Sequence, residues 1–121
     1  MFNEMSKSKK IDWAYDSSKN EWSFLDDWVA EGKPDTFVVR GFFINPHGKI
    51  TKKDIGEVPY VVTDGYNIRL PIWYVKMANM ILDNEEYISG INQGLCGARI
   101  EQYEDNFGQT RNKIILYDIE N

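Results

Sequence analysis

The chain has 121 residues, which is enough for one domain with a substantial hydrophobic core. Its hydrophobic content of 42% and aromatic content of 14% argue against a disordered protein. The formal net charge of -5 argues against a protein that holds duplex DNA by broad neutralisation of phosphates.

Cysteine and histidine are almost absent from the sequence. The single cysteine, Cys96, cannot form an internal disulfide, and with one histidine, His47, a zinc site of thiolate and imidazole ligands has too few members. The first residues, MFNEMSKSKK, lack the apolar stretch of a signal peptide, and no run approaches the roughly 20 apolar residues that cross a membrane. We therefore expect a cytoplasmic protein with no membrane partner, no metal and no cofactor.

The first ten residues differ in character from those that follow. Residues 1–10 are polar and show no periodicity, which predicts a mobile tail, and residues 11–121 predict a single β-rich domain. At the start of this domain, the segment IDWAY-DSSKN-EWSF predicts a short hairpin. Trp13 and Tyr15 alternate on one face of its first strand, and the Ser, Lys and Asn residues favour a turn.

A short helix is predicted directly after this hairpin. Ser23 followed three residues later by Asp26 is typical of an N-cap with an acid in the first turn. Gly32 is typical of a helix end, so the helix is expected at residues 25–31. The same residues are also compatible with the closing strand of the hairpin.

Two strand-forming regions precede the main helix. The run TFVVRGFFIN is β-branched and aromatic, which predicts a strand buried on both faces, and Gly41 inside it predicts a bulge, a bend or a close backbone approach. The next segment, NPHGKITKKDIGE, predicts a loop that carries several lysines. Asp64-Gly65 then predicts a two-residue turn that joins Val58–Thr63 to Tyr66–Leu70 as a tight hairpin.

Residues 71–94 contain the longest stretch of helical periodicity. Pro71 suits the first turn of a helix, and apolar side chains recur at spacings of three and four residues. Asp83-Asn84 favours a break into two helices with a new N-cap. The segments LCGARIEQY and RNKIILYDI then predict a closing hairpin with Phe107 at its tip.

The order of these elements predicts the fold class. A long strand, a hairpin, one main helix and a closing hairpin form the order of the OB-fold, a five-stranded Greek-key barrel. We therefore expect an α+β, β-rich domain with a small OB-like barrel and one main helix between strand pairs. The alternative is an open antiparallel sheet with one helix packed on it. An uncovered edge at Arg111–Ile119 would favour a homo-oligomer.

No residue pattern in the sequence predicts catalysis. P-loop, dinucleotide-binding, metalloprotease and EF-hand motifs are missing. His47 lies in a predicted turn without an identified nucleophile or acid, and Cys96 lies in a predicted strand, where a core role is expected. Carboxylate pairs such as Glu85-Glu86 are expected to be solvated charges. We therefore predict a protein that is not an enzyme and has no catalytic or metal site.

Arginines and aromatic rings recur together on the predicted strands. Proteins that bind single strands combine a positive groove with rings on which bases stack. Because side chains alternate along a strand, Arg40 is expected to share a face with Phe42, and Arg99 with Tyr103. The competing interpretation of each residue is a core ring or an arginine at a strand edge. The candidate nucleic-acid-binding residues are Arg40, Phe42, Lys49, Lys52, Lys53, Tyr66, Arg69, Arg99 and Tyr103.

Binding of another protein is the alternative function. Exposed aromatic rings are common at the energetic centres of protein interfaces, and acidic stretches can mimic nucleic acid. Trp13, Tyr15 and Trp22 are the candidate partner-binding residues, although they would equally close one end of a barrel. A barrel that binds a small molecule is a third hypothesis.

Several motifs between about Gly41 and Asp118 carry a family resemblance: GFFIN, VVTDGYNIRLP, ISGINQGLCGARIEQYE and KIILYDI. This part of the chain resembles small early-region proteins of bacteriophages and prophages of low-GC Gram-positive bacteria, and is similar to their OB-like single-stranded DNA-binding accessory proteins. The resemblance implies non-sequence-specific binding of single-stranded DNA or RNA in the cytoplasm of a host cell. An acidic inhibitor or adaptor that acts on a host protein is the alternative. The motifs concern packing and turns, so they imply no binding residue.

Overall fold

The computed structural model describes residues 11–50 and 53–120, and within residues 49–55 it describes only the backbone. The predicted mobile tail at residues 1–10 lies outside the described residues. In chain order the elements are β1 (Glu21–Phe24), α2 (Leu25–Ala30), β2 (Thr36–Val38), β3 (Gly41–Ile50), β4 (Lys53–Thr63), β5 (Tyr66–Arg69), the 3-10 turn η1 (Ile72–Tyr74), α3 (Val75–Leu82), α4 (Glu85–Asn92), β6 (Cys96–Glu104) and β7 (Thr110–Asp118).

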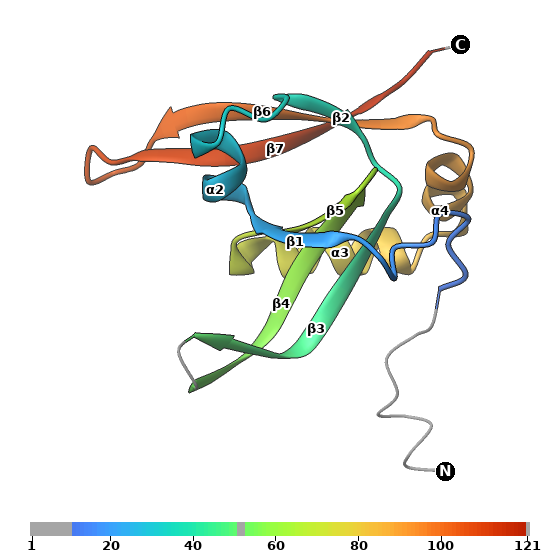
Figure 1. Ribbon diagram of the computed structural model, residues 1–121, viewed down its shortest axis with the longest axis horizontal. Helices are drawn as coiled ribbons and strands as arrows, with labels where there is room; N and C mark the ends of the chain where they lie inside the picture. Colours follow the sequence, from blue (N-terminus) through green and yellow to red (C-terminus); the bar gives the residue numbers. More distant parts are fainter. Residues whose placement is uncertain (1–10, 51–52, 121) are drawn as a thin grey trace.

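The strands form two sheets, which Figure 1 shows as an upper and a lower layer. One sheet has the order β1-β5-β4-β3, and the other has the order β2-β6-β7. β1 runs parallel to β5, and the other strand pairs are antiparallel. The α+β, β-rich class is therefore confirmed. The described strands do not close into a barrel, so the predicted barrel is not confirmed, and the open-sheet alternative fits better.

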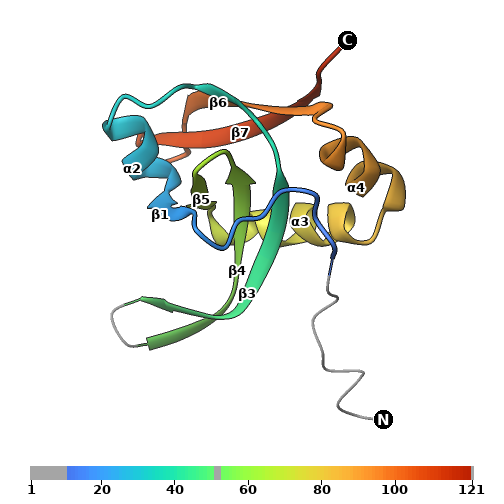
Figure 2. The same ribbon diagram turned by 45° about the vertical axis from the view of Figure 1, so that its right-hand side comes forward.

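The predicted strand TFVVRGFFIN is divided between the two sheets. β2 pairs with β6 and β3 pairs with β4, so the chain changes sheet at Val39 and Arg40. The backbone N–H of Val39 donates to the carbonyl of Cys96 at 2.8 Å, and that of Arg40 donates to the carbonyl of Val62 at 2.7 Å. Figure 2 shows β3 curving down from the upper layer after this corner. The corner thus joins the two sheets through continuous backbone hydrogen bonding.

The predicted N-terminal hairpin is wrong. Residues 11–20 form no strand, and β1 finds its partner in β5 instead of in the segment that precedes it. Trp13 packs on Gly41, where a Cβ atom would lie 3.1 Å from the indole ring. The close backbone approach predicted for Gly41 is therefore confirmed. This contact, between residues far apart in sequence, takes the place of the expected strand pairing.

The predicted short helix is confirmed as α2, but its predicted cap is not. The N-cap residue is Phe24, which has no side chain that can accept a hydrogen bond. Ser23 lies in β1, where its hydroxyl donates to the carbonyl of Phe24 at 3.3 Å. After the helix, Gly32 adopts a φ of 72°, the left-handed conformation that favours glycine at a helix end.

The predicted central loop is an extension of β3 and β4. The antiparallel ladder continues past Asn45, with register shifts on both sides of Gly48. A Cβ atom at Gly48 would lie 2.9 Å from the Cβ of buried Val58. Only glycine therefore fits at this position of β3, beside β4. The turn-forming residues of this segment therefore produce irregularities within two strands instead of ending them. The predicted turn at Asp64-Gly65 is confirmed, with Thr63 paired to Tyr66.

The region that follows the hairpin divides as predicted. Pro71 precedes η1, so it starts a 3-10 turn before the α-helix begins. α3 ends at Leu82, and the Asn84 side chain accepts hydrogen bonds from the N–H groups of Glu86 and Tyr87 at 3.0 Å and 3.2 Å. The predicted break and new N-cap are therefore confirmed. β6 and β7 likewise confirm the closing hairpin.

The core unites side chains of both sheets and of the helices. Its buried members are Leu25, Trp28, Val39, Phe42, Val61, Ile68, Leu70, Tyr74, Ile81, Ile91, Ala98, Ile100 and Ile114. Among them, Tyr74 reaches from η1 to β7, where its hydroxyl accepts from Ile114 N at 2.9 Å and donates to Ile114 O at 3.3 Å. Asn112 also donates to Asp26 at 2.9 Å. The β7 edge predicted to be uncovered at Arg111–Ile119 is therefore partly occupied.

Candidate nucleic-acid interface

One row of side chains crosses all four strands of the β1-β5-β4-β3 sheet. The register pairs Phe24 with Arg69, Arg69 with Tyr60, and Tyr60 with Phe43. Directly opposite residues share a face of a sheet, and this face points away from the core. Trp22 lies two residues before Phe24 on β1 and therefore shares the same face. We call this surface the aromatic face, and it consists of Trp22, Phe24, Phe43, Tyr60 and Arg69.

The rings of the aromatic face contact one another in a specific arrangement. Phe43 and Tyr60 stack with 4.7 Å between ring centroids and 11° between planes. Trp22 stands edge-on to both, 5.9 Å from Phe43 and 5.3 Å from Tyr60. The Arg69 guanidinium lies 5.3 Å from the centre of the Phe24 ring. Because Phe43 and Tyr60 cover each other, the largest exposed surfaces belong to Trp22, which is 66% exposed, and Phe24, which is 51% exposed.

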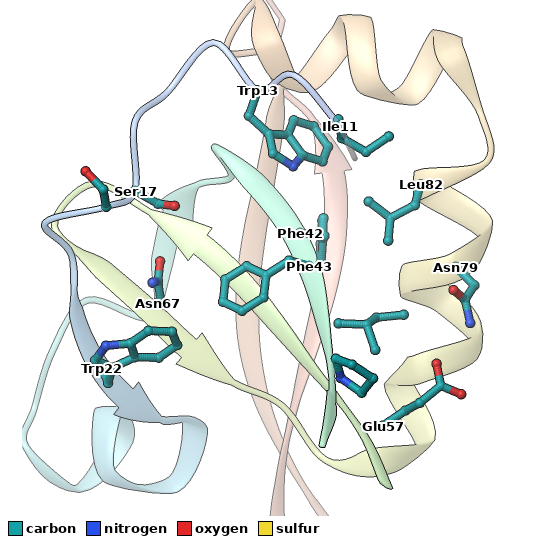
Figure 3. Close-up of a pocket in the computed structure, with 13 residues that line it drawn as sticks. Ile11, Trp13, Ser17, Trp22, Phe42, Phe43, Glu57, Asn67, Asn79 and Leu82 are labelled. Carbon is teal, nitrogen blue, oxygen red and sulfur yellow. The ribbon is translucent and has the colours of Figure 1, made fainter. Parts of the chain in front are cut away.

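A pocket of about 570 Å³ borders the aromatic face along β3 (Figure 3). Trp22, Phe43 and Asn67 line its β1 side, and Trp13 lines the side toward α3. Asn67 is buried and accepts a hydrogen bond from the side chain of Asn20 at 3.1 Å. The volume falls in the range of small-ligand sites, and the lining combines rings with amides. The pocket therefore places amide side chains next to the rings of the aromatic face.

Phe42 must be withdrawn from the candidate site. Its side chain is 0% exposed, because its position in the ladder turns it toward the core with Val61 and Ile68. It therefore has no ring face for a base. Arg40 lies at the corner between the sheets and forms an ion pair with Asp64 at 3.0 Å.

Tyr66 and Arg69 lie on opposite faces of β5, because they are three positions apart along the strand. The Tyr66 ring packs against Trp28, with 5.1 Å between centroids, on the core side. Its hydroxyl accepts a hydrogen bond from Lys33 Nζ at 3.2 Å, and this bond raises the pKa of Lys33. Of the predicted pair, only Arg69 belongs to the aromatic face.

Arg99 and Tyr103 share a face, but it belongs to the β2-β6-β7 sheet. The Arg99 guanidinium forms an ion pair with Glu101 at 3.1 Å, and Lys113 Nζ lies 5.5 Å from the centre of the Tyr103 ring. Arg40, Arg69 and Arg99 therefore do not converge on one surface, which corrects the prediction that they act together.

Of the predicted lysines, Lys49 and Lys53 lie at the far end of the ladder that carries Phe43 and Tyr60. The backbone of Lys49 belongs to β3 and that of Lys53 to β4, while Lys52 lies outside the described residues. The side chains of all three lie outside the described part of the chain. Their assignment to the site stays a prediction.

Trp13 and Tyr15, two of the three predicted partner-binding residues, make contacts within the chain. Trp13 packs on Gly41, and the Tyr15 hydroxyl donates to Asn20 at 2.8 Å and accepts from Gly65 N at 2.9 Å. Trp22 alone of the three is largely exposed.

Sequence reasoning missed Phe24, Phe43 and Tyr60. A signal for part of this row was present, because a two-residue turn at Asp64-Gly65 fixes Tyr60 opposite Arg69. No short-range signal placed Phe24 there, because β1 pairs with a strand more than 40 residues later in the chain.

The tip of the β6-β7 hairpin is held by one carboxylate. Asp105 accepts hydrogen bonds from Arg111 Nε at 2.9 Å and from the backbone N–H groups of Gln109 at 3.0 Å and Phe107 at 2.8 Å. The bond from Arg111, followed by those from the backbone, lowers the pKa of Asp105. The turn presents Phe107, which is 89% exposed, at its end.

The Cys96 thiol and possible groups of metal ligands are the remaining chemical candidates. Burial raises the pKa of Cys96 to about 11, so its thiol is protonated near neutral pH and is a poor nucleophile. Across residues 11–50 and 53–120, no group of three His, Cys, Asp or Glu side chains is suitably placed for a metal ion. In the same part of the chain, no helix has the length and apolar character required to cross a membrane.

Comparison of the chain with family models, with curated proteins and with solved structures gave no match.

Proposed function

We propose that the chain is a phage-type accessory protein whose aromatic face binds single-stranded nucleic acid without sequence specificity. Bases stack on Trp22 and Phe24, and the phosphate backbone runs beside Arg69. The observation that carries this proposal is the cross-strand row of rings and a cation, of which Trp22 and Phe24 are more than half exposed. Base stacking on an aromatic side chain contributes roughly 1–3 kcal/mol per base and tolerates every base type.

An OB-like barrel that is open along one seam is part of this proposal. The element order supports it, as does the continuous path from β2 to β3 through the corner at Val39-Arg40. In the proposed barrel, the seam lies between β7 and the β1-β5 pair, and the Tyr74 hydroxyl bonds to β7 at this edge. In OB-folds the second and third strands face the oligonucleotide. β4 and β5 occupy these positions in the proposed correspondence and carry Tyr60 and Arg69.

The electrostatics favour a single strand bound at low salt. The net charge of -5 disfavours broad contact with duplex phosphates, so the proposed affinity rests on stacking together with few cations. Arg69 supplies one cation within the row, and Lys49, Lys52 and Lys53 are the further cations of the proposed site. This combination suits a weak, sequence-tolerant binder.

Replacement of Trp22 provides the direct test. We expect Trp22→Ala to weaken binding of a labelled oligothymidylate by about tenfold or more at low salt, because one stacked base is lost. Trp73→Ala is the matched control, since Trp73 is 60% exposed but lies on η1, outside the aromatic face. The Trp73→Ala variant should bind the oligonucleotide with the affinity of the wild type. Fluorescence anisotropy measures both. Failure of the wild type to bind at low salt, or equal weakening by both substitutions, would contradict the proposal.

The salt dependence of binding tests the role of Arg69. For single strands, the slope of log affinity against log salt changes by about 0.7 for each phosphate contact removed. Arg69→Gln should therefore reduce the slope by about this amount. Arg99→Gln, on the outer face of the other sheet and paired with Glu101, should leave the slope unchanged. Identical slopes for the wild type and Arg69→Gln would remove Arg69 from the interface.

The alternative function, an inhibitor or adaptor that binds a host protein, uses the same exposed rings. Trp22 and Phe24 with the neighbouring Arg69 have the composition of an interface hot spot. Nuclease treatment separates the two hypotheses: a partner protein retained on the wild type after nuclease, and lost with Trp22→Ala, would favour the alternative.

A further inference from the structure

An apolar groove lies between the two helices and the C-terminal strand, away from the row that forms the aromatic face. It is lined by side chains of α3, of α4 and of the adjoining ends of β6 and β7, and has a volume of about 520 Å³. Figure 1 shows α4 at the end of the molecule where β6 begins and β7 ends. The apolar lining includes Met77, Met80, Ile81, Tyr87, Ile91 and Leu116.

The floor of the groove is buried and its rim is exposed. Ile81 and Ile91 are 4% and 3% exposed and belong to the core. On the rim, Met80 is 59% exposed and Tyr87 is 49% exposed. Large apolar side chains that stay exposed beside a hollow are typical of a surface that another molecule covers. Methionine suits such a surface, because its flexible thioether adapts to differently shaped partners.

The two charged side chains that line the groove are both acidic. Glu86 and Asp118 are the charged residues that line it, and no cation among the described residues forms an ion pair with either. Of the elements that form the walls, α4 contains Glu85 and Glu86 but neither lysine nor arginine, and Lys76 of α3 is not among the residues that line the groove. An apolar floor with an acidic rim is complementary to apolar side chains flanked by basic ones.

We propose that this groove binds a basic amphipathic helix of a partner protein. The apolar face of that helix enters between Met80 and Tyr87, above Ile91, and its lysines or arginines meet Glu86 and Asp118. Insertion of an amphipathic helix into an apolar groove is a common mode of peptide recognition, and methionine-rich grooves accept varied helices. The site is separate from the aromatic face, so the chain presents one surface for nucleic acid and another for a basic protein segment.

Calorimetry with synthetic peptides tests the proposal on the full chain. The probe is a peptide of leucine and lysine spaced as an amphipathic helix, and the control peptide carries glutamate in place of every lysine. We expect the lysine peptide to bind and the glutamate peptide not to bind. Met80→Ser should weaken binding of the lysine peptide by about tenfold, as for an exposed anchor of an interface. Phe107→Ser, at the remote hairpin tip, should leave it unchanged.

The acidic rim is tested by a double substitution that keeps the shape of the groove. Glu86→Gln with Asp118→Asn should weaken binding of the lysine peptide and remove most of its salt dependence. Trp22→Ala should bind the peptide as the wild type does, so a failure of nucleic-acid binding and a failure of this site are distinguishable. The proposal is overturned by equal binding of both peptides, by unchanged affinity in Met80→Ser, or by self-association of the chain that Met80→Ser abolishes.

Discussion

Phe42→Ala is expected to lower the free energy of unfolding by about 3–5 kcal/mol, the range for removal of a buried phenylalanine ring. The Phe42 side chain is 0% exposed and lies in the core cluster, directly opposite Val61. The core around Phe42 combines side chains of both sheets and of the helices, so the surrounding backbone has little freedom to fill the vacated space. Urea unfolding followed by circular dichroism measures the loss, with the slope m used to check that two-state behaviour is kept.

Phe43→Ala is the matched control, because it removes the same ring from the next position of the same strand. Phe43 is partly exposed and contacts Tyr60 and Trp22 on the aromatic face. We expect a smaller loss of stability, of the order of the 0.5–1.5 kcal/mol that aromatic pairs contribute, together with weakened oligonucleotide binding. A comparable loss of stability in both variants would show that both sides of β3 are equally buried, and would exclude the aromatic face as a ligand surface.

Local sequence signals predicted the elements that depend on neighbouring residues. The two-residue turn at Asp64-Gly65 fixed the β4-β5 register, because positive φ at glycine and short loop length leave few alternatives. Asn84 predicted the start of α4 for a similar reason, since its side chain caps the helix by accepting hydrogen bonds from the N–H groups of Glu86 and Tyr87. Such features need no knowledge of the remaining chain.

Contacts between distant residues explain the elements that sequence reasoning missed. Alternation of Trp13 and Tyr15 was read as a strand, but Trp13 packs on Gly41 and Tyr15 bonds to the turn at Gly65. The side-chain pattern of a strand and that of an extended segment docked on a sheet are the same. For the central segment, the sequence predicts a loop where the structure has strands. Its Asn, Pro and Gly residues, which usually end strands, here accompany shifts in register.

The candidate site shows the same division between local and distant information. Alternation along one strand placed Arg99 and Tyr103 on a common face, but it gave no information about which sheet that face belongs to. The change of sheet at Val39-Arg40 separates Arg40 from the aromatic face, although only two residues lie between Arg40 and Phe43. Convergence of side chains from different strands depends on register and on sheet order. Both are set by pairings such as β1 with β5, which no short motif encodes.

Tyr74→Phe is expected to destabilise the chain through a single hydroxyl group. That hydroxyl accepts from Ile114 N at 2.9 Å and donates to Ile114 O at 3.3 Å, so it occupies the β7 edge where a strand would otherwise pair. Phenylalanine keeps the ring, but it leaves the buried N–H and carbonyl groups of Ile114 without the hydroxyl as a hydrogen-bond partner. Each buried polar group left unpaired costs about 1–3 kcal/mol. The expected loss, measured by urea unfolding, is therefore at least about 1 kcal/mol, accompanied by faster hydrogen exchange of the Ile114 amide.

The pH dependence of the stability lost in Tyr74→Phe provides a second, independent measurement. Burial is the main cause that raises the pKa of Tyr74, so the folded protein favours the neutral phenol. The resulting contribution to stability is fully present below the unfolded pKa of about 10, and it is lost as pH rises through the higher folded pKa. The difference in stability between the wild type and Tyr74→Phe should therefore be constant near neutral pH and shrink above about pH 10. Tyr117→Phe, which changes a partly exposed tyrosine on β7, should leave the stability near neutral pH unchanged. If Tyr74→Phe and Tyr117→Phe gave the same stability at every pH, the Tyr74 hydroxyl would have no role in closing the edge of β7.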